Sequence, residues 1–521
     1  MSPHSHRRSL LKKTLQVGSS TMVSRVLGFV REMLQVRYLG VGAAADAFIT
    51  AFRIPNSLRK MFAEGALSAA FVPAIVGITK DQGQLAASRL LSRVFWMVES
   101  GVLIACVLLA WNAHLVIHFI VPGFSAEQIA YAIPFLRILI FFIFFISISA
   151  LASGALQAVH NFFVPAFGQV ILNSVIIVGL IACLYGGWAF TAYAWIIIAG
   201  GAIQAGLSVY AYLKQGFVFA RADDAAKAHA RNVLYKFLPC LVSAGAVEIS
   251  LFIDAQCASY LHTGSIALFT YAYGFMRMPL GVFVVAFSTI TLSHFARVGA
   301  YAPKRLSYFL FEACKFFFWV LVPVVFLMSF FAEDIFRTLY LSDNFSYAHV
   351  LQAKNVLIIL MQGLFFHSIN KILLNMCYAL HETHIPSIIA IACTALNTLL
   401  NFVLMRYMQL AGIAVATTVA AVVQTLLLVW VLYAKFHFKL YVRQFGYFVA
   451  RAVLQQVMVG TVLIGTVYGI KQLLQHSTYT WAYLFVDTIG FWVWVGPLCG
   501  IAALFLWYTR HFFNVHLYFL D

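Results

Sequence analysis

Charged side chains gather near the start of the chain, in two stretches that otherwise hold apolar and small residues. The first stretch runs from Ser24 to Glu32 and contains Arg25 and Arg31. Its planar guanidinium groups can bind phosphate oxygens through pairs of parallel hydrogen bonds. The chemistry that these residues indicate is therefore binding of an anion, above all one that carries a pyrophosphate. The second stretch contains Asp46, Arg53, Arg59, Lys60 and Glu64.

The spacing of the first stretch fits one face of a helix. Arg25 and Glu32 are nearly two helical turns apart and would stack, with Gly28 between them and Arg31 about 120° round the helix. Each charge costs about 2.5–3.5 kcal/mol at the bilayer centre, so the set must face protein or water. The alternative is that the arginines anchor helix ends by snorkelling, which their long apolar flanks disfavour.

The second stretch forms a similar line if Pro55 only bends the helix. Anchoring at helix ends is again the alternative to a binding role. Arg59 is expected to point away from that line. The residues expected close to the line are Asp46, Arg53, Lys60 and Glu64.

Four short motifs resemble the MurJ/MviN family of lipid II flippases, which belongs to the multidrug/oligosaccharidyl-lipid/polysaccharide exporter superfamily. They are SRVLGFVRE from residue 24, ADAF from residue 45, PN from residue 55 and FAEGA from residue 62. The resemblance covers essentially the whole chain and is most specific in the first two spans. It places cavity arginines at Arg25, Arg31 and Arg59, with Glu32 where the family usually has Asp. The predicted substrate-binding set is Ser24, Arg25, Arg31, Glu32, Asp46, Arg53, Arg59, Lys60, Glu64 and Arg277.

Arg277 enters this set because the chain departs from the family in the eighth span. The family usually carries Ala-Asp-Arg there, whereas this chain has AYGFMRMP from residue 272. Arg277 stands three residues after the place where the family carries its Asp-Arg, and a step of three residues keeps a side chain near the same helix face. We expect Arg277 to supply the missing cavity charge; the alternative is a change confined to the structure of this span.

A second polar set in the later half could bind a hard cation. The set has oxygen ligands only, and Asn397 and Asn401 share a helix face. By resemblance, some family members hold sodium at such positions, with an acid where Asn401 stands here. The alternative is hydrogen bonding between packed spans. The predicted sodium ligands are Asp254, Asn397, Asn401, the Ile413 carbonyl and Thr417; no other cofactor is expected.

Composition places the chain in the membrane. Of 521 residues 63% are hydrophobic and only 10% charged, and the mean hydropathy is +0.90, which predicts an all-α polytopic membrane protein. The net charge of +17 indicates cytoplasmic anchoring first and an anionic ligand second. The eight cysteines form no Cys-X-X-Cys pair, so disulfides and cysteine-bound metals are not expected. No Walker-type loop is present, which argues against ATP hydrolysis.

Hydropathy predicts about 14 spans. An even number places both termini on one side, and about twenty Lys and Arg inside against about three outside make that side cytoplasmic. The predicted spans are 14–38, 44–78, 90–121, 128–158, 162–185, 189–213, 233–261, 265–297, 306–332, 347–379, 385–407, 411–434, 446–474 and 484–509.

An internal repeat indicates two pseudo-symmetric six-helix bundles around a central cavity. The segments AVHNFFVP from residue 158 and ALHETHIP from residue 379 share Ala, His and Pro at equal spacing, and parallel repeats build many transporters. The predicted division is an N-terminal lobe (1–213), a cytoplasmic linker (214–232), a C-terminal lobe (233–434) and two extra helices with a tail (435–521), which by resemblance form a groove for a lipid tail.

The function expected from these features is a flippase in the bacterial inner membrane. By resemblance it moves lipid II, undecaprenyl-pyrophosphate linked to a disaccharide peptide, from the inner to the outer leaflet by alternating access. Membrane potential would drive an anion outwards, and cell-wall synthesis enzymes are expected partners beside the membrane lipids. One alternative is export of another polyprenyl-linked oligosaccharide or of drugs. A membrane-embedded glycosyltransferase is a further alternative, which short loops without clustered acids disfavour.

Overall fold

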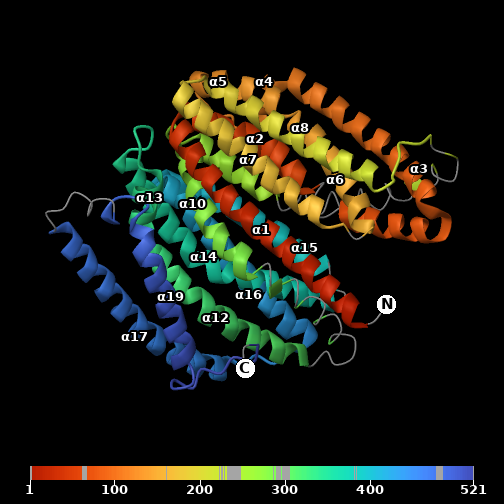
Figure 1. Ribbon diagram of the computed structural model, residues 1–521. Coiled ribbons are helices and arrows are strands. Elements are labelled where there is room, and N and C mark those ends of the chain that lie inside the picture. Colours follow the sequence, from red (N-terminus) through yellow and green to blue (C-terminus); the bar gives the residue numbers. More distant parts are fainter. Residues whose placement is uncertain are drawn as a thin grey trace. The chain divides into compact units, whose positions relative to one another are not determined.

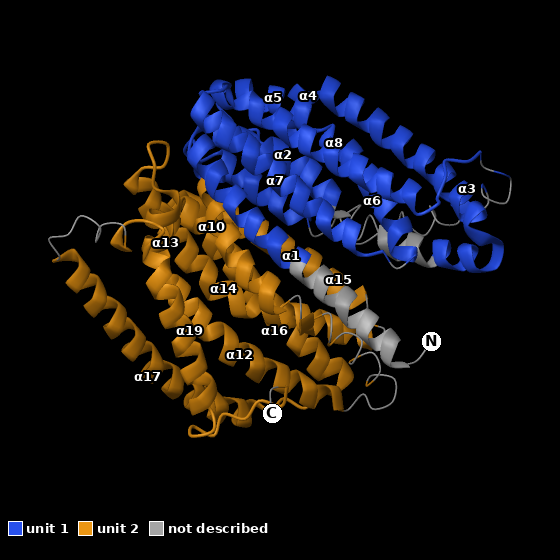
Figure 2. Ribbon diagram, viewed as in Figure 1, with its two compact units in different colours: residues 1–267 blue, residues 268–521 orange. Residues whose placement is uncertain are grey.

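The computed structural model is helical wherever it has regular structure in the part that it describes (Figure 1). The chain divides into two compact units, residues 1–267 and residues 268–521 (Figure 2). The described residues are 3–61, 67–159, 161–221, 223, 227, 229–231, 248–284, 287–288, 291, 295, 298, 305–380, 382, 384–476 and 485–519.

Unit 1 is a bundle in which helices far apart in sequence pack together. Helix α1 packs on α7, α2 on α5, α3 on α6, and α8 on both α6 and α7. Helix α10 (Ser265–Pro279) crosses into the second unit. The others are α1 (Pro3–Leu39), α2 (Ala43–Met61), α3 (Leu67–Trp111), α4 (Ala113–Ile120), α5 (Ala126–Leu139), α6 (Phe142–Ala158), α7 (Phe163–Gly186) and α8 (Phe190–Lys214).

Unit 2 repeats part of this packing. Helix α16 packs on both α14 and α15, as α8 does on α6 and α7, while α12 packs on α14 and α17. Its elements are the π-helix η2 (Leu280–Val284), α12 (Leu306–Phe330), α13 (Ala332–Tyr340), α14 (Tyr347–Ala379), α15 (His384–Met408), α16 (Leu410–Phe436), α17 (Val442–Gln475) and α19 (Phe491–Thr509).

The turns of the internal repeat occupy equivalent places. The first lies between the end of α6 at Ala158 and the start of α7 at Phe163, and the second between Ala379 and His384. In the second turn the Glu382 carboxylate accepts hydrogen bonds from the Lys435 ammonium and from the backbone N–H of His384. These contacts lower the pKa of Glu382 below its usual range. The predicted lobe and linker boundaries themselves stay a prediction.

The membrane fold is confirmed, with differences in detail. In the described residues, 11 helices are long and apolar enough to cross a membrane. The predicted number of 14 stays a prediction, because spans 233–261 and 265–297 lie partly outside the described residues. The stretch between the predicted second and third spans is helical on both sides of Gly83, because α3 runs through it with a break at that glycine. Gly83 has φ 84° and ψ 172°, a conformation that glycine adopts without a Cβ clash.

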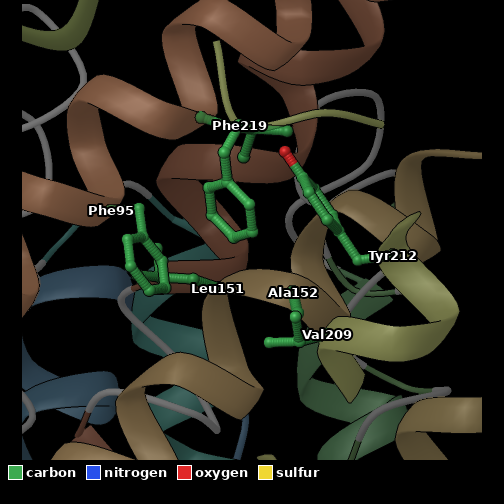
Figure 3. A pocket seen from close by; sticks show the side chains of 7 residues that line it. Phe95, Leu151, Ala152, Val209, Tyr212 and Phe219 are labelled. Carbon is green, nitrogen blue, oxygen red and sulfur yellow. The ribbon is translucent and has the colours of Figure 1, made fainter. Parts of the chain in front are cut away.

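The first part of the predicted linker (214–232) is hydrogen-bonded to α3. The hydroxyls of Ser88 and Ser92 accept the backbone N–H groups of Val218 and Ala220. Phe219 then closes an apolar cavity of about 20 Å³ (Figure 3), room for about one water molecule. The cavity is lined by Leu91, Phe95, Leu151, Ala152, Val209, Tyr212 and Phe219.

The last two long helices are joined to α12 through one buried amide. Gln455 of α17 accepts the Trp319 indole N–H at 3.1 Å. Its own Nε2 donates to the Leu506 carbonyl and to the Thr509 hydroxyl of α19 at 2.7 and 2.8 Å. Within a bilayer the hydrophobic effect does not drive helices together, so interhelical hydrogen bonds such as these contribute to helix association. Figure 1 shows α17 beside α19.

Candidate functional site

The face of α1 that carries Ser24, Gly28 and Arg31 is held against α7 by Asn173. Arg31 Nη1 donates to Asn173 Oδ1 at 3.1 Å, and Asn173 Nδ2 donates to the Ser24 carbonyl at 3.2 Å. Gly28 lies between them, where a Cβ would stand 3.9 Å from Asn173 Nδ2. The short residues at positions 24 and 28 let α7 approach closely, so that Asn173 fixes the direction of the Arg31 guanidinium.

The other α1 charges differ in exposure. Arg25 is exposed, whereas Arg31 and Glu32 are half-buried. The Nε–H of Arg31 is buried and has no acceptor among the residues that the structure describes. One turn further on, the Tyr193 hydroxyl donates to Gln35 Oε1 at 2.9 Å. Helix α1 therefore presents arginines on two of its sides.

The Asp46 carboxylate of α2 is buried and accepts hydrogen bonds from the protein itself. The side chain is 1% exposed. Its Oδ2 accepts the Gly264 N–H at 2.6 Å and the Gln128 amide at 2.9 Å, and its Oδ1 accepts the Ala267 N–H at 2.8 Å. Asp46 thus caps the first turn of α10, where unpaired N–H groups need acceptors. Its predicted role in substrate binding stays a prediction.

One face of α2 follows a neighbouring helical segment in the antiparallel sense. Arg53 donates to the Leu251 carbonyl, and Ser57 donates to Glu248 Oε2 at 2.6 Å. Together with Asp46, these residues face the segment from residue 248 to 267. The described part of the predicted line, Asp46 and Arg53, therefore packs against this segment.

The remaining α2 charges lie at its second end. The Arg59 Nε–H donates to Asn56 Oδ1 at 3.1 Å on the same helix, and the expected direction of Arg59 stays a prediction. Helix α2 continues through Pro55 to Met61. Lys60 is in the helix, but its side chain and the whole of Glu64 lie outside the described residues.

Arg277 lies in unit 2, near the end of α10. Its side chain is exposed, and its guanidinium carbon stands 6.0 Å from the Tyr273 ring centre, one turn earlier. The π-helix η2 follows directly, and such π-turns often accompany functional sites. The Tyr273 ring holds the cation by a cation–π contact; the role of Arg277 in a cavity stays a prediction.

The predicted sodium ligands are divided between the two units. Asn397 and Asn401 are buried on one face of α15, which packs on α16. On α16 the Ile413 carbonyl accepts the Thr417 hydroxyl at 2.9 Å. Asp254 is buried in unit 1. The oxygen-rich donor set of α15 and α16 fits a hard cation, and sodium binding stays a prediction.

Comparison with known proteins decides the family. The family model described as "Lipid II flippase MurJ" matches residues 35–486. The chain belongs to the MurJ family. The match begins after the charged part of α1 and includes all of α2, so the motif from Ser24 to Glu32 adds to it independently.

Individual MurJ relatives agree with this assignment. A "Probable lipid II flippase MurJ" of Rhizobium tropici is 29% identical over 440 residues, 82% of either chain. A "Lipid II flippase MurJ" of Burkholderia cenocepacia is 29% identical over 428 residues, 81% of this chain and 83% of the relative.

Solved structures show the same fold. One described as "Lipid II flippase MurJ, inward closed conformation" has TM-score 0.76 and 24% identity, covering 96% of this chain and 99% of that one. An inward-facing multidrug MATE transporter has TM-score 0.68 and 15% identity, covering 80% of this chain and 96% of the other. MurJ proteins and multidrug exporters thus share an architecture, which leaves function to the site residues.

The sequence did not single out the partners of the charged residues. Two of these partners bond predicted site residues: Asn173 bonds Arg31, and Gln128 bonds Asp46. The third, Glu248, accepts the hydroxyl of Ser57, one turn after Arg53. Asn173 and Glu248 stand in otherwise apolar surroundings, which is a usable signal because polar groups inside a membrane are costly. Gln128 carries no such signal, since it also completes the capping box of α5 with Ser125.

Proposed function

We propose that this protein translocates lipid II across the inner membrane, from the inner to the outer leaflet. The observation that carries the proposal is the MurJ family match over residues 35–486. Relatives of the same family are named lipid II flippases. The protein then acts as a transporter, with no bond made or broken.

The arginines of α1 and α2 are proposed to bind the pyrophosphate. Arg31 is held by Asn173 and keeps one buried N–H without an acceptor in the described residues. A phosphate oxygen is a strong acceptor for such a group. Arg25, which is exposed, and Arg59 are proposed as further contacts, with Arg277 contributing from the second half.

The transport cycle is proposed to be alternating access between two repeated halves. The shared packing of α8 on α6 and α7, and of α16 on α14 and α15, supports a repeat that can move as two bodies.

The polyprenyl tail is proposed to stay in lipid beside α17 and α19. The oxygen-rich residues of α15 and α16 are proposed to hold sodium and reset the cycle. Both termini are proposed to be cytoplasmic, on the strength of the basic inner segments.

The test is translocation of labelled lipid II in vesicles that contain the purified protein. We expect the Arg25→Ala, Arg31→Ala and Arg59→Ala variants to lose at least about tenfold in rate, the scale of one lost charge-assisted hydrogen bond. Arg37→Ala, in the last turn of α1, is the matched control and should keep the wild-type rate.

The contrary outcomes are distinct. If wild type moves no lipid II, the substrate is wrong, and export of another polyprenyl-linked oligosaccharide or of drugs takes its place. If wild type moves lipid II and all arginine variants match it, the cargo is right and the arginines are anchors.

A further inference from the structure

Unit 1 holds a membrane-facing arginine that serves none of the roles described so far. Arg137 lies in the last turn of α5 and is exposed. Among the residues that the structure describes, it has no hydrogen bond, ion pair or ring contact. The acids on its neighbouring helix segments are engaged elsewhere or distant: Glu99 accepts the Ser147 hydroxyl at 2.8 Å, and Glu127 is in the first turn of α5.

Two mostly apolar cavities that open to the surface of unit 1 meet at this arginine. One has a volume of about 600 Å³ and extends from Arg137 between α3, α6 and α8. The other, of about 640 Å³, lies against the last turns of α3. Both volumes fall in the range of about 300–1,000 Å³ that is usual for ligand clefts. Leu103, Phe144, Trp195 and Ile198 line the first, and Val107, Ala110 and Trp111 line the second.

Arg137 lies well inside the span that begins at Ala126, in the half of the span nearer to the end of α3 and the start of α8. It stands eleven residues into α5, about 16 Å from the first residue at about 1.5 Å per residue. Its flexible stem lets the guanidinium rise towards the interface. Trp111 and Trp195 beside it are 83% and 61% exposed, and tryptophan favours the level of lipid headgroups. Under the proposed orientation this is the outer leaflet.

A lone guanidinium within an apolar cleft selects its occupant by charge. In the membrane it requires a counter-anion, and the planar fork matches a phosphate group. The aromatic and aliphatic walls match an acyl chain. We propose that Arg137 and the cleft around it form a binding site for a single anionic phospholipid. The phosphate of this lipid contacts Arg137, and one of its acyl chains lies between α3 and α8.

The site differs from the proposed transport site in its residues and its helices. None of the predicted substrate-binding residues lines either cavity. The lipid would act as a bound structural lipid of unit 1, filling a cleft that side chains leave open. The inference does not depend on what the protein transports.

Photolabelling tests the proposal. The full-length protein is reconstituted in phosphatidylcholine vesicles with a trace of phosphatidylglycerol that carries a photoreactive group in one acyl chain. We expect label on peptides that contain 103–111 and 195–198. In Arg137→Gln the label at these peptides should fall about tenfold, the scale of one lost charge-assisted contact.

Three comparisons keep the test decisive. Arg406→Gln removes an exposed arginine from the last turn of α15 that lines neither cavity, and should label as wild type does. Arg137→Lys keeps the charge and should recover part of the label. A diacylglycerol probe with the same chains, lacking the phosphate, should label weakly and without regard to residue 137.

Several results would overturn the proposal. They are absence of phosphatidylglycerol label from both peptides in wild type, equal label in Arg137→Gln, or equal label by the diacylglycerol probe. If Arg137→Gln instead crosslinks less to a second membrane protein in native membranes while its lipid label is unchanged, the cleft binds a protein helix. An unchanged thermal midpoint of the variant shows that it has folded.

Discussion

At the scale of single residues, the charged groups of α2 divide into those that the protein uses itself and those that remain for a ligand. Asp46 accepts three hydrogen bonds at the start of α10, and Arg53 donates to the Leu251 carbonyl. Arg59 is bonded to Asn56 on its own helix. Asp46 and Arg53 therefore hold α2 in place, while Arg59 is proposed, with Arg25 and Arg31, to contact the substrate.

Replacing Asp46 tests its role as a cap. Asp46→Ala leaves three buried donors without acceptors, at about 1–3 kcal/mol for each unsatisfied group. We expect a clearly lower thermal unfolding midpoint for the purified protein, with Asp46→Asn falling between wild type and Asp46→Ala because it keeps one acceptor. Asp343→Ala, at an exposed position, is the control and should leave the midpoint unchanged. Equal midpoints for both Asp46 variants and wild type would show that the cap contributes little.

At the scale of elements, the C-terminal helices are tied to α12 and α13 of unit 2 by several polar contacts. Gln455 joins α12, α17 and α19, and Trp319 packs with Phe448, Ala452, Val515 and Leu517 in one buried cluster. These contacts fix the helices that we propose to border the lipid tail.

Removing the Gln455 amide should loosen this junction. In Gln455→Leu the Trp319 indole loses its acceptor, and interhelical hydrogen bonds in membranes are worth on average about 0.6 kcal/mol and at most about 1.7. We expect a small fall in thermal midpoint and faster amide hydrogen exchange in α19. Gln475→Leu, at the exposed end of the same helix, is the control. Unchanged exchange in α19 would contradict the prediction.

At the scale of the whole molecule, we propose that the membrane potential biases the direction in which an anionic cargo moves. An anion moving outwards is favoured by a negative interior, by about 2.3 kcal/mol per charge per 100 mV. This bias requires no ATP and agrees with the absence of a Walker-type loop in the sequence.

An imposed potential should therefore bias translocation of lipid II in vesicles. With the cytoplasmic side negative at 100 mV, we expect the outward-to-inward ratio to rise about fiftyfold per transported charge, and to reverse with the sign of the potential. A ratio that does not respond to potential would show electroneutral transport. Replacing sodium by potassium at constant potential then tests the proposed cation step.

The sequence by itself determined the membrane class, the positions of most spans, the internal repeat and the family. These follow from local hydropathy and short motifs, and the ranges of α14 and α16 match their predicted spans closely. The tertiary structure alone decided which charges are already satisfied, because their partners are remote: Asp46 and Gly264 are 218 residues apart, and Arg31 and Asn173 are 142 apart. It also decided that two helical segments of α3 meet at a break at Gly83, since a backbone break at a single glycine leaves no trace in hydropathy.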